Sequence, residues 1–478
     1  MRNPDYGKYP FTALLALAVL LAHLNSFWGS FQFDDYKVIV DNPVVHSWSS
    51  WLADIKHGIR PFLKFTYTLN WTSGLGVFGF HAFNITVHML NTLLVYLLSC
   101  RFLAGQAESQ PEMIKYTAFT AALLFGLHPV QTEAVTYISS RSTSLMFLLY
   151  LSSFFTYLHG RSASRPFFLY LLSPALFFLA LATKEIAVTL PAALLLWEAT
   201  CGDRPLSLSS ALKAQAVHWA LAGCALIALF LHPRYGELLL YSLDLRSVQH
   251  NLLSQIHGVS HLLSRFLLMH RLSIDPDLPV LTVWSPLLAC EALMLGSVAL
   301  TGALLIRRKP VVTFCIFWFI LHLLPTSSLI PRIDIANERQ LYCGSWGLFL
   351  LAGTGFVRLC GLRQRDMRPL WRGLALAALV LAAFTTMRNR AYRSEISLWE
   401  DTARTTPGKA RVFNNLGYAY YLSGRYGEAA KAYKRALQLK PDYALARNNL
   451  STVEHGKPGE SVKKGSLPQG AGCLEYKK

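Results

Sequence analysis

The chain has 478 residues, of which 53% are hydrophobic and only 15% charged, and it carries a net charge of +18. This composition is too apolar for one soluble globular domain, and the chain is too long for one compact core, which favours an integral membrane protein. The eight cysteines are scattered and form no C-x-x-C pair, so neither a metal site nor a disulfide framework is indicated.

Apolar segments close to the roughly 20 residues that a membrane-crossing helix needs recur along the chain. They predict an all-α polytopic bundle of about eleven transmembrane helices. The candidate spans are Phe11–Phe27, His81–Leu103, Tyr116–Leu127, Ser142–Leu158, Phe167–Thr183, Ile186–Trp197, Ala214–Leu231, Leu287–Ile306, Val311–Leu329, Leu341–Val357 and Leu374–Thr386. The first segment lacks a small-residue cleavage site and is read as an anchor.

Lys and Arg residues in the short loops predict the orientation. With a cytoplasmic N-terminus, sixteen of them lie on the cytoplasmic side, against four in the opposite short loops. The segment after the first span and everything after Thr386 then face outward. Because the net charge mostly reflects this bias, a nucleic-acid partner is not needed to explain it.

Two long outward loops, 28–80 and 232–286, are predicted between the spans. In the first, Val44–Ile55 has the pattern of a short amphipathic helix lying on the membrane. In the second, Asn251–His270 has helical apolar spacing but carries several basic side chains, which favours an interfacial or re-entrant helix. If that helix spans the membrane, the sidedness of everything downstream is reversed.

One motif is misleading. Gly74-Leu-Gly-Val-Phe-Gly79 matches the dinucleotide-binding G-x-G-x-x-G pattern, but a predicted membrane span follows it and no strand precedes it. It is interpreted as a turn that leads into a helix.

The composition changes after Thr386. Residues 410–443 match the 34-residue tetratricopeptide pattern, and the preceding stretch fits the second helix of a degenerate repeat. Because one repeat cannot bury its own apolar face, the flanking helices complete the stack. The predicted domains are a membrane domain at 1–386, a repeat domain at 387–453 and a disordered basic tail at 454–478.

Adjacent carboxylates, Asp34 and Asp35, lie just beyond the first span among aromatic residues. Acidic residues suit turns and helix caps, but partial desolvation and a neighbouring charge would also raise the pKa of one carboxylate. A raised pKa suits a general base for a weakly acidic hydroxyl.

Positive residues on the outward side are the second candidate feature, because the charge bias disfavours them there. Each could pair with a neighbouring acid; as a set, they indicate a phosphate-binding shell. They are Arg60, Lys64, Arg141, Lys184, Arg332 and Arg339.

Several motifs occur in one order along the chain, and together they resemble a known family. They are Phe33-Asp-Asp35, Arg60-Pro61, Asn70…Gly79-Phe-His81…Asn84…His88, His128-Pro129…Glu133…Arg141, Lys184-Glu185…Thr189-Leu-Pro191, Leu329-Ile-Pro331…Glu338-Arg339…Tyr342 and the terminal repeat. This combination is similar to that of the transmembrane and tetratricopeptide-repeat O-mannosyltransferases and their bacterial relatives, which have the GT-C glycosyltransferase fold. The chain departs from the family in having one clear repeat in place of a long array.

The resemblance implies transfer of a hexose, with mannose the candidate, from a polyprenyl-phosphate donor to Ser or Thr of a protein at the extracytoplasmic face, with inversion. Asp34 would be the base, and Asp35 would orient the acceptor, tune Asp34 or hold a divalent cation; no other cofactor is implied. The implied donor-phosphate ligands are Arg60, Arg141, Lys184 and Arg339. The second-rank site residues are His128, Glu133, Arg332 and Glu338.

The repeat has two interpretations. It caps the outer domain, or its groove holds an acceptor polypeptide through Asn414, Tyr418, Tyr421 and Asn448. The alternatives to protein glycosylation are a lipid-sugar ligase or polymerase and an inactive membrane scaffold; a transporter fits less well, because no internal duplication is seen. A bacterial inner membrane with a periplasmic site is the expected location, and the endoplasmic reticulum with a luminal site is the alternative.

Overall fold

The structure is a computed structural model that describes residues 10–105, 110–202, 207–327, 329–360 and 367–455. Within these ranges the chain forms helices, turns and loops and no β-strand. The α-helices are α1 (Pro10–His23), α2 (Trp48–Asp54), α3 (Pro61–Thr72), α4 (Gly76–Ala104), α5 (Pro111–Leu127), α6 (Thr132–Val135), α7 (Arg141–Ala163), α8 (Ser173–Leu181), α9 (Leu190–Thr200), α10 (Leu208–Ala214), α11 (Ala216–Leu231), α12 (Pro233–Leu245), α13 (Val248–Leu268), α14 (Pro286–Leu304), α15 (Pro310–Leu323), α16 (Leu341–Leu359), α17 (Arg368–Ala391), α18 (Glu395–Thr405), α19 (Ala410–Leu422), α20 (Tyr426–Leu439) and α21 (Ala444–His455).

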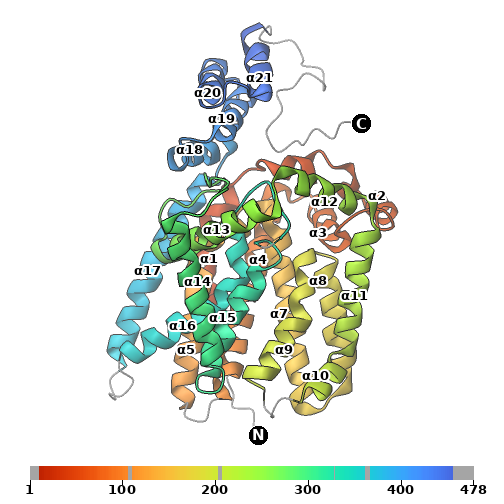
Figure 1. The fold of residues 1–478 in the computed structure, drawn as a ribbon, viewed down its shortest axis with the longest axis vertical. Coiled ribbons are helices and arrows are strands. Elements are labelled where there is room, and N and C mark those ends of the chain that lie inside the picture. The colour runs from red at the N-terminus through yellow and green to blue at the C-terminus, as the bar shows by residue number, and fades with distance from the viewer. Residues whose placement is uncertain (1–9, 106–109, 203–206, 328, 361–366, 456–478) are drawn as a thin grey trace.

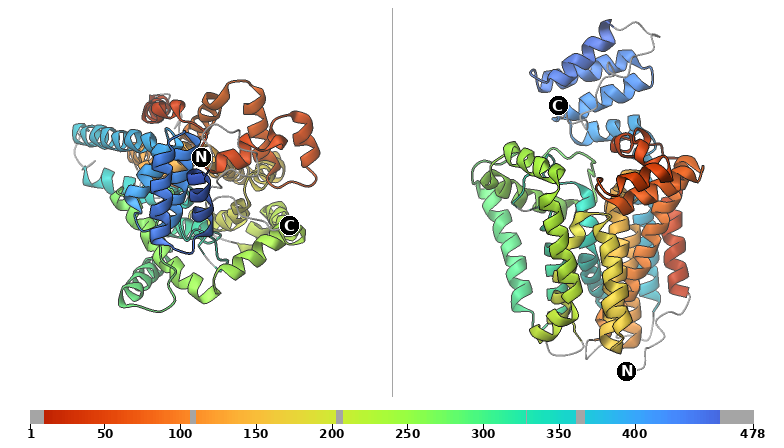
Figure 2. Two further views of the ribbon diagram at one scale, coloured as in Figure 1. Left: turned by 90° about the horizontal axis from the view of Figure 1, so that it is seen from above. Right: turned by 90° about the vertical axis from the view of Figure 1, so that its right-hand side faces the viewer.

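The helices form two parts. Most of those from α1 to α17 run roughly alongside one another in a bundle, and α18–α21 stand on one end of it (Figure 1). A side view shows that α1 starts at the opposite end and leads up to the end that carries the repeat domain (Figure 2). The loop with the paired carboxylates therefore lies at the same end as the repeat domain, as the charge pattern predicts.

Aromatic side chains fill much of the bundle core. The fully buried rings of Trp318 on α15 and Trp346 on α16 meet edge to face with centroids 4.7 Å apart. Phe102 on α4 packs against Phe314 on α15 at 4.4 Å. Such pairs add to the stabilisation that burial of apolar area supplies, and they join helices that are far apart in the sequence.

Four helical segments of the described chain are long and apolar enough to cross a membrane: Pro10–Trp28, Gly76–Ala104, Pro286–Leu304 and Arg368–Ala391. A fifth is possible if the bent pair α10 and α11 forms one span. Every segment predicted to span is at least largely helical, but several are short or interrupted; Phe167–Leu172, for example, is a π-helical turn before α8. The predicted total of eleven transmembrane helices is therefore not confirmed.

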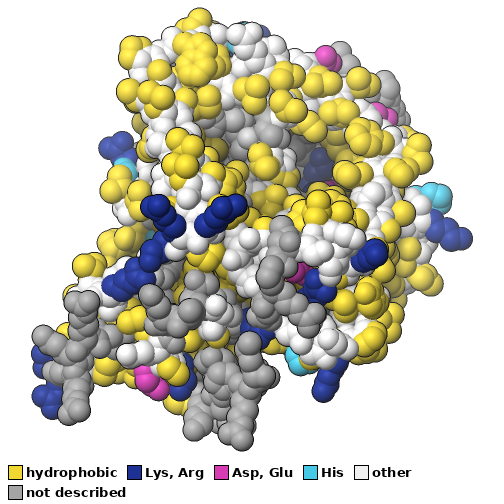
Figure 3. Space-filling view, turned by 60° about the horizontal axis from the view of Figure 1, so that its bottom comes forward, with side chains coloured by type: hydrophobic (Ala, Val, Ile, Leu, Met, Phe, Trp, Pro, Cys, Tyr) yellow, Lys and Arg dark blue, Asp and Glu magenta, His cyan; other side chains and the backbone are white. Residues whose placement is uncertain are grey.

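Charged side chains gather at the bundle end that lies opposite the repeat domain. Figure 3 brings that end forward and shows hydrophobic flanks and Lys and Arg side chains around the end. Arg165, Arg307, Arg308, Lys309 and Arg372 are exposed residues of the set predicted for the cytoplasmic side. Apolar flanks with a basic end are typical of a membrane protein that follows the positive-inside rule.

Short helices cover the end that carries the repeat domain. α12 and α13 run across the end of the bundle (Figures 1 and 2). The predicted helix at 251–270 is thus present as part of α13, and it lies across the bundle rather than along it. Ser247 begins α13 by accepting a hydrogen bond from the backbone of His250, as an N-cap serine does. The predicted amphipathic segment Val44–Ile55 is helical in most of its length, as the end of the 3₁₀ turn Pro43–Val45 and as α2.

The G-x-G-x-x-G motif forms no nucleotide-binding unit. Gly74 and Gly76 have φ angles of +72° and +56°, and α4 begins at Gly76. The element before the motif is the helix α3, so the glycines serve a left-handed turn between two helices.

The repeat domain has the predicted helix pairs. α19 and α20 form the clear repeat, α18 supplies the preceding helix and α21 closes the stack. A Cβ atom on Gly417 would lie 2.6 Å from the Tyr433 ring, so the glycine is required for α19 and α20 to approach each other. The residues predicted for the tail after His455 lie outside the described residues.

Candidate functional site

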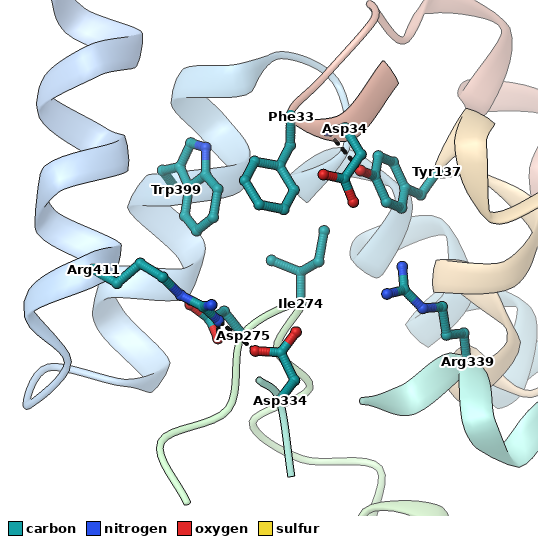
Figure 4. A pocket seen from close by; sticks show the side chains of 9 residues that line it. All are labelled: Phe33, Asp34, Tyr137, Ile274, Asp275, Asp334, Arg339, Trp399 and Arg411. Atoms are coloured by element: carbon teal, nitrogen blue, oxygen red, sulfur yellow. Dashed lines mark hydrogen bonds and ion pairs between the residues drawn. The ribbon is translucent and has the colours of Figure 1, made fainter. Parts of the chain in front are cut away.

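A small pocket lies where the bundle meets the repeat domain (Figure 4). It encloses about 40 Å³, well below the roughly 300 Å³ at which small-molecule pockets begin. The bundle contributes loop residues, and α18 and α19 of the repeat domain contribute one side chain each. The lining residues are Phe33, Asp34, Tyr137, Ile274, Asp275, Asp334, Arg339, Trp399 and Arg411.

Asp34 is the sequence-predicted base, and it lies in this pocket. Its backbone N–H donates a hydrogen bond of 2.9 Å to the hydroxyl oxygen of Tyr137. Burial raises the pKa of the Asp34 carboxyl above its ordinary value, while the Arg339 charge and Tyr137 act in the opposite direction. The carboxylate therefore combines access to the pocket with an increased affinity for a proton.

Asp35, by contrast, is buried, and both of its carboxylate oxygens accept hydrogen bonds. One carboxylate oxygen accepts the backbone N–H of Gln32 at 3.0 Å, and the other accepts that of Ser139 at 2.8 Å. Burial has the larger effect on the pKa of Asp35 and raises it to about 7, although the two hydrogen bonds lower it. Asp35 thus joins the loop after α1 to the loop before α7. It does not face the pocket as an acceptor ligand would.

Arg339 enters the pocket from the short 3₁₀ helix Glu338–Gln340 and is held by Glu133. The backbone N–H of Arg339 donates to Glu133 Oε2 at 2.9 Å, and the guanidinium lies 3.5 Å from Glu133 Oε1. Glu133 is fully buried, and burial raises the pKa of its carboxyl even though Arg339 lowers it. Two of the predicted site residues are therefore in contact, with Glu133 setting the position of Arg339.

Lys184, Arg332 and Arg339 form a cationic group, which we call the cation cluster. Lys184 donates a hydrogen bond of 2.7 Å to the Thr143 hydroxyl. Burial and the charges of Arg339, Arg60 and Arg332 together lower the pKa of Lys184 to about 7. The Arg332 side chain makes no hydrogen bond or ion pair with any residue that the structure describes. Burial and neighbouring positive charges lower the pKa values of Lys184 and Arg332, and together with Arg339 these groups form a positively charged environment suited to an anion.

Arg60 is close to the cation cluster but already paired. Its guanidinium donates two hydrogen bonds to Glu185, at 2.9 and 2.7 Å. This two-pronged contact lowers the pKa of Glu185 to about 2. Tyr235 of α12 also donates to Glu185. The expectation that Arg60 binds phosphate directly is weakened, because Glu185 occupies its hydrogen-bonding face.

The contacts of Arg141 do not fit the prediction that it binds the donor phosphate. It is fully buried, and it donates to the Asn84 side chain at 2.6 Å and to the backbone oxygens of Thr66 and Phe80. Its guanidinium also lies 4.3 Å from the ring centroid of Phe83. Every contact fixes α3, α4 and α7 together, so Arg141 stabilises the fold and is not available to a donor phosphate.

Two second-rank residues also have structural roles. His128 Nδ1 accepts the backbone N–H of Val130, its ring stacks on Phe266, and burial lowers its pKa to about 4. Glu338 accepts the backbone N–H of Ser273 and lies 3.8 Å from Arg388 of α17, and burial raises its pKa to about 8. Neither residue lines the pocket; both join segments around it.

The predicted acceptor groove is only partly present. Asn414 is buried and accepts a hydrogen bond of 3.0 Å from Asn449, so it packs the repeat and does not face an acceptor. Tyr418 and Tyr421 are half-buried, and Asn448 is exposed. The groove prediction is therefore wrong for Asn414, while the other three residues remain accessible candidates.

The structure adds site residues that the sequence reasoning missed. Arg411 of α19 donates to Asp275 at 2.9 Å and to Asp334 at 2.6 Å, and all three line the pocket. Trp399 of α18 lies beside Phe33. Asp334 was recognisable as an acid two residues from Arg332, but no local signal connects the repeat residues to the loop that carries Asp34.

Metal binding was left open by the sequence. The described residues contain no group of three or more His, Cys, Asp and Glu side chains arranged to hold a metal ion. Asp35, the sequence candidate, has both oxygens engaged by backbone N–H groups.

Comparison with known proteins supports the motif-based resemblance. Residues 410–443 match the family model of the tetratricopeptide repeat. The chain is similar to the protein O-mannosyl-transferases TMTC1 of Mus musculus, at 27% identity over 95% of the chain, and of Homo sapiens, at 28% over 92%. It is also similar to the protein O-mannosyl-transferase F38B6.6 of Caenorhabditis elegans, at 25% identity over 90%. The resemblance to this family is thus confirmed over most of the chain.

The relatives are longer than the chain. The alignments cover 60%, 56% and 62% of the mouse, human and nematode proteins. All three come from animals, so the expected bacterial inner membrane is not supported, although the apolar helices indicate a membrane protein.

Proposed function

We propose that this protein is a membrane glycosyltransferase that transfers a hexose from a polyprenyl phosphate to Ser or Thr of a protein. The names of its relatives favour mannose as the sugar and a protein as the acceptor. The reaction takes place at the bundle end that carries the repeat domain, on the extracytoplasmic face, which in an animal cell corresponds to a luminal one. The single observation that carries the proposal is the placement of Asp34 and Arg339 in one pocket.

Asp34 is the general base in this proposal. A serine or threonine hydroxyl is a weak acid, and a carboxylate with a raised pKa removes its proton more effectively than an ordinary one. As the hydroxyl proton passes to Asp34, the acceptor oxygen forms a bond to the anomeric carbon. The bond from that carbon to the phosphate oxygen breaks, its electron pair leaves with the lipid phosphate, and the anomeric configuration inverts.

The cation cluster receives the leaving phosphate. Arg332 and Lys184 have no acid partner among the described side chains, and Arg339 is only loosely paired with Glu133 at 3.5 Å. Fixed positive charges stabilise negative charge as it develops on a leaving group, which is commonly the largest electrostatic contribution to catalysis. Glu133 acts as a positioning residue, because it holds the backbone and the guanidinium of Arg339.

The lipid donor fits the location of these groups. They lie at the end of an apolar bundle, where a phosphate headgroup would meet a membrane surface while its chain remained in hydrocarbon. The pocket of about 40 Å³ is too small for a hexose, so the donor and acceptor must widen it when they bind.

The test is a transfer assay on full-length protein in nanodiscs. Radiolabelled polyprenyl-phosphate sugars are offered one at a time with cell-derived acceptor protein, and the wild type is compared with Asp34→Asn. Label in protein with the wild type alone supports the proposal and names the sugar. Label in lipid or polysaccharide would instead identify a ligase or polymerase. No transfer from any donor by a folded protein would contradict the enzyme assignment and favour a scaffold.

A further inference from the structure

The loop that carries Asp34 is attached to the start of the repeat domain. The backbone N–H of Ser30 donates to the carbonyl oxygen of Arg393 at 3.2 Å. The side-chain amide of Gln32 donates to the carbonyl oxygen of Tyr392. Both acceptors lie in the short link between α17 and α18, so backbone atoms far along the chain hold the loop that carries Asp34.

Phe33, the residue before Asp34, has an unusual conformation. Its φ angle is +45°, in the left-handed region that residues other than glycine rarely adopt. Such a conformation persists only when surrounding contacts stabilise it. The relevant contact is the ring of Trp399 in α18, which meets the Phe33 ring edge to face at a centroid distance of 5.2 Å and an angle of 84°.

Trp399 is itself firmly held. It is 1% exposed and packs in the apolar cluster that includes Leu398 and Val412 of the repeat domain and Ile274 of the bundle. Arg411 of α19 adds ion pairs to Asp275 and Asp334 of the bundle. The repeat domain is therefore clamped to the loops around the pocket, and α18 gives the catalytic loop a fixed support.

We propose that Trp399 is a positioning residue for Asp34: its ring holds Phe33 in the left-handed conformation that directs the Asp34 carboxylate into the pocket. The repeat domain is then a working part of the active site, in addition to any role in acceptor binding. The effect of Trp399 on catalysis rests on the proposed function, but its effect on the conformation of the loop can be tested independently.

The kinetic test uses Trp399→Ala and Trp399→Phe in full-length protein. Misplacement of a catalytic group lowers rates on the order of 100-fold, so kcat of Trp399→Ala is expected to fall 10- to 100-fold while the KM for the donor stays unchanged. Trp399→Phe keeps an aromatic ring and should recover most of kcat. Trp284→Ala is the matched control, because Trp284 is 60% exposed and outside the pocket. Unchanged kcat in Trp399→Ala would overturn the inference.

A structural readout separates positioning from a general loss of fold. Hydrogen exchange at residues 30–36 should increase in Trp399→Ala, with exchange in α4 and α7 unchanged. Unchanged exchange at 30–36 would overturn the inference, and so would loss of protection throughout the bundle in both Trp399 variants.

A third measurement compares the effect of Trp399→Ala on kcat in the wild type with its effect in a protein that already carries Phe33→Gly. Glycine tolerates φ of +45° without the ring contact, so Trp399→Ala should add little to the effect of Phe33→Gly on kcat. Fully additive effects would mean that Trp399 acts elsewhere. If the wild type transfers no sugar, the proposed function fails, while hydrogen exchange still decides whether Trp399 holds the loop.

Discussion

The backbone N–H of Asp34 donates a 2.9 Å hydrogen bond to the phenolic oxygen of Tyr137, 103 residues further along the chain. The next residue repeats the connection, because Asp35 accepts the backbone N–H of Ser139 at 2.8 Å. The loop after α1 is thus fixed to the segment before α7 on both sides of the Asp34 carboxylate. One acid of the pair is left facing the pocket, and the other holds the loop in place.

Asp34→Asn should abolish sugar transfer and leave the fold intact. The substitution is nearly isosteric but removes the proton-accepting carboxylate, whose contribution as a general base is typically about 10²- to 10⁴-fold. The measurement is the transfer rate beside the thermal unfolding temperature in the same nanodiscs. Wild-type activity in this variant would eliminate Asp34 as the base.

Tyr137→Phe should reduce kcat by roughly 5- to 10-fold. The lost hydroxyl is the acceptor for the Asp34 N–H, and an unpaired buried donor costs about 1–3 kcal/mol. The donor KM should not change, since Tyr137 does not belong to the cation cluster. If KM rises and kcat is preserved, Tyr137 contacts the donor and does not position the base.

Arg332→Ala and Arg339→Ala should each raise the donor KM by about 10-fold or more, because each removes a charge from the predicted phosphate site. The matched control is Arg307→Ala, an exposed residue of the basic bundle end, which should behave as the wild type.

Arg141→Ala should instead lower the unfolding temperature. Donor kinetics that respond to Arg141 and not to Arg332 would reverse the assignment made from the structure.

Donor use should fall as the pH rises through about 7. The folded pKa of Lys184 is lowered to about 7 by burial and by Arg339, Arg60 and Arg332, so its charge is present below that pH and lost above it. The measurement is kcat/KM for the donor between pH 6 and 9. Lys184→Arg keeps its charge and should remove this part of the dependence; an identical profile in the variant would show that another group titrates.

Arg411→Met should loosen the repeat domain from the bundle by about 1–3 kcal/mol, because it removes the ion pair of the half-buried Asp334 and leaves the buried Asp275 with Lys409 as its ion-pair partner. Faster proteolysis near residues 392–394 would report this. The control is Arg425→Met in the same repeat, whose ion pair with Glu428 is exposed on both sides, and the expected effect is close to zero. Equal sensitivity in the two variants would mean that the Arg411 ion pairs do not hold the domains together.

Several features were predictable because their causes are local. The repeat follows from apolar and small residues at a fixed period, and Gly417 beneath Tyr433 is the packing that this period encodes. Apolar segments of sufficient length predict helices, and each predicted segment is largely helical. The position of Asp34 beyond the first span was enough to single it out as a candidate.

The different roles of the charged residues could not be predicted from local sequence patterns. Arg141 and Arg332 look alike in the sequence. Arg141 is buried and donates to the Asn84 side chain, whereas Arg332 has no ion-pair partner among the described residues and its charge acts on Lys184. Likewise, Asp34 and Asp35 are neighbours, and the tertiary contacts from Tyr137 and Ser139 help to distinguish them.

Local patterns therefore specified the helices, the repeat and the general area of the site. Only the tertiary structure decided which acid faces the pocket, which cations have no acid partner among the described side chains, and that Trp399 and Arg411 of the repeat domain complete the pocket. The physical reason is that pairing and burial, which control the charge and availability of a side chain, depend on neighbours that are distant in the sequence.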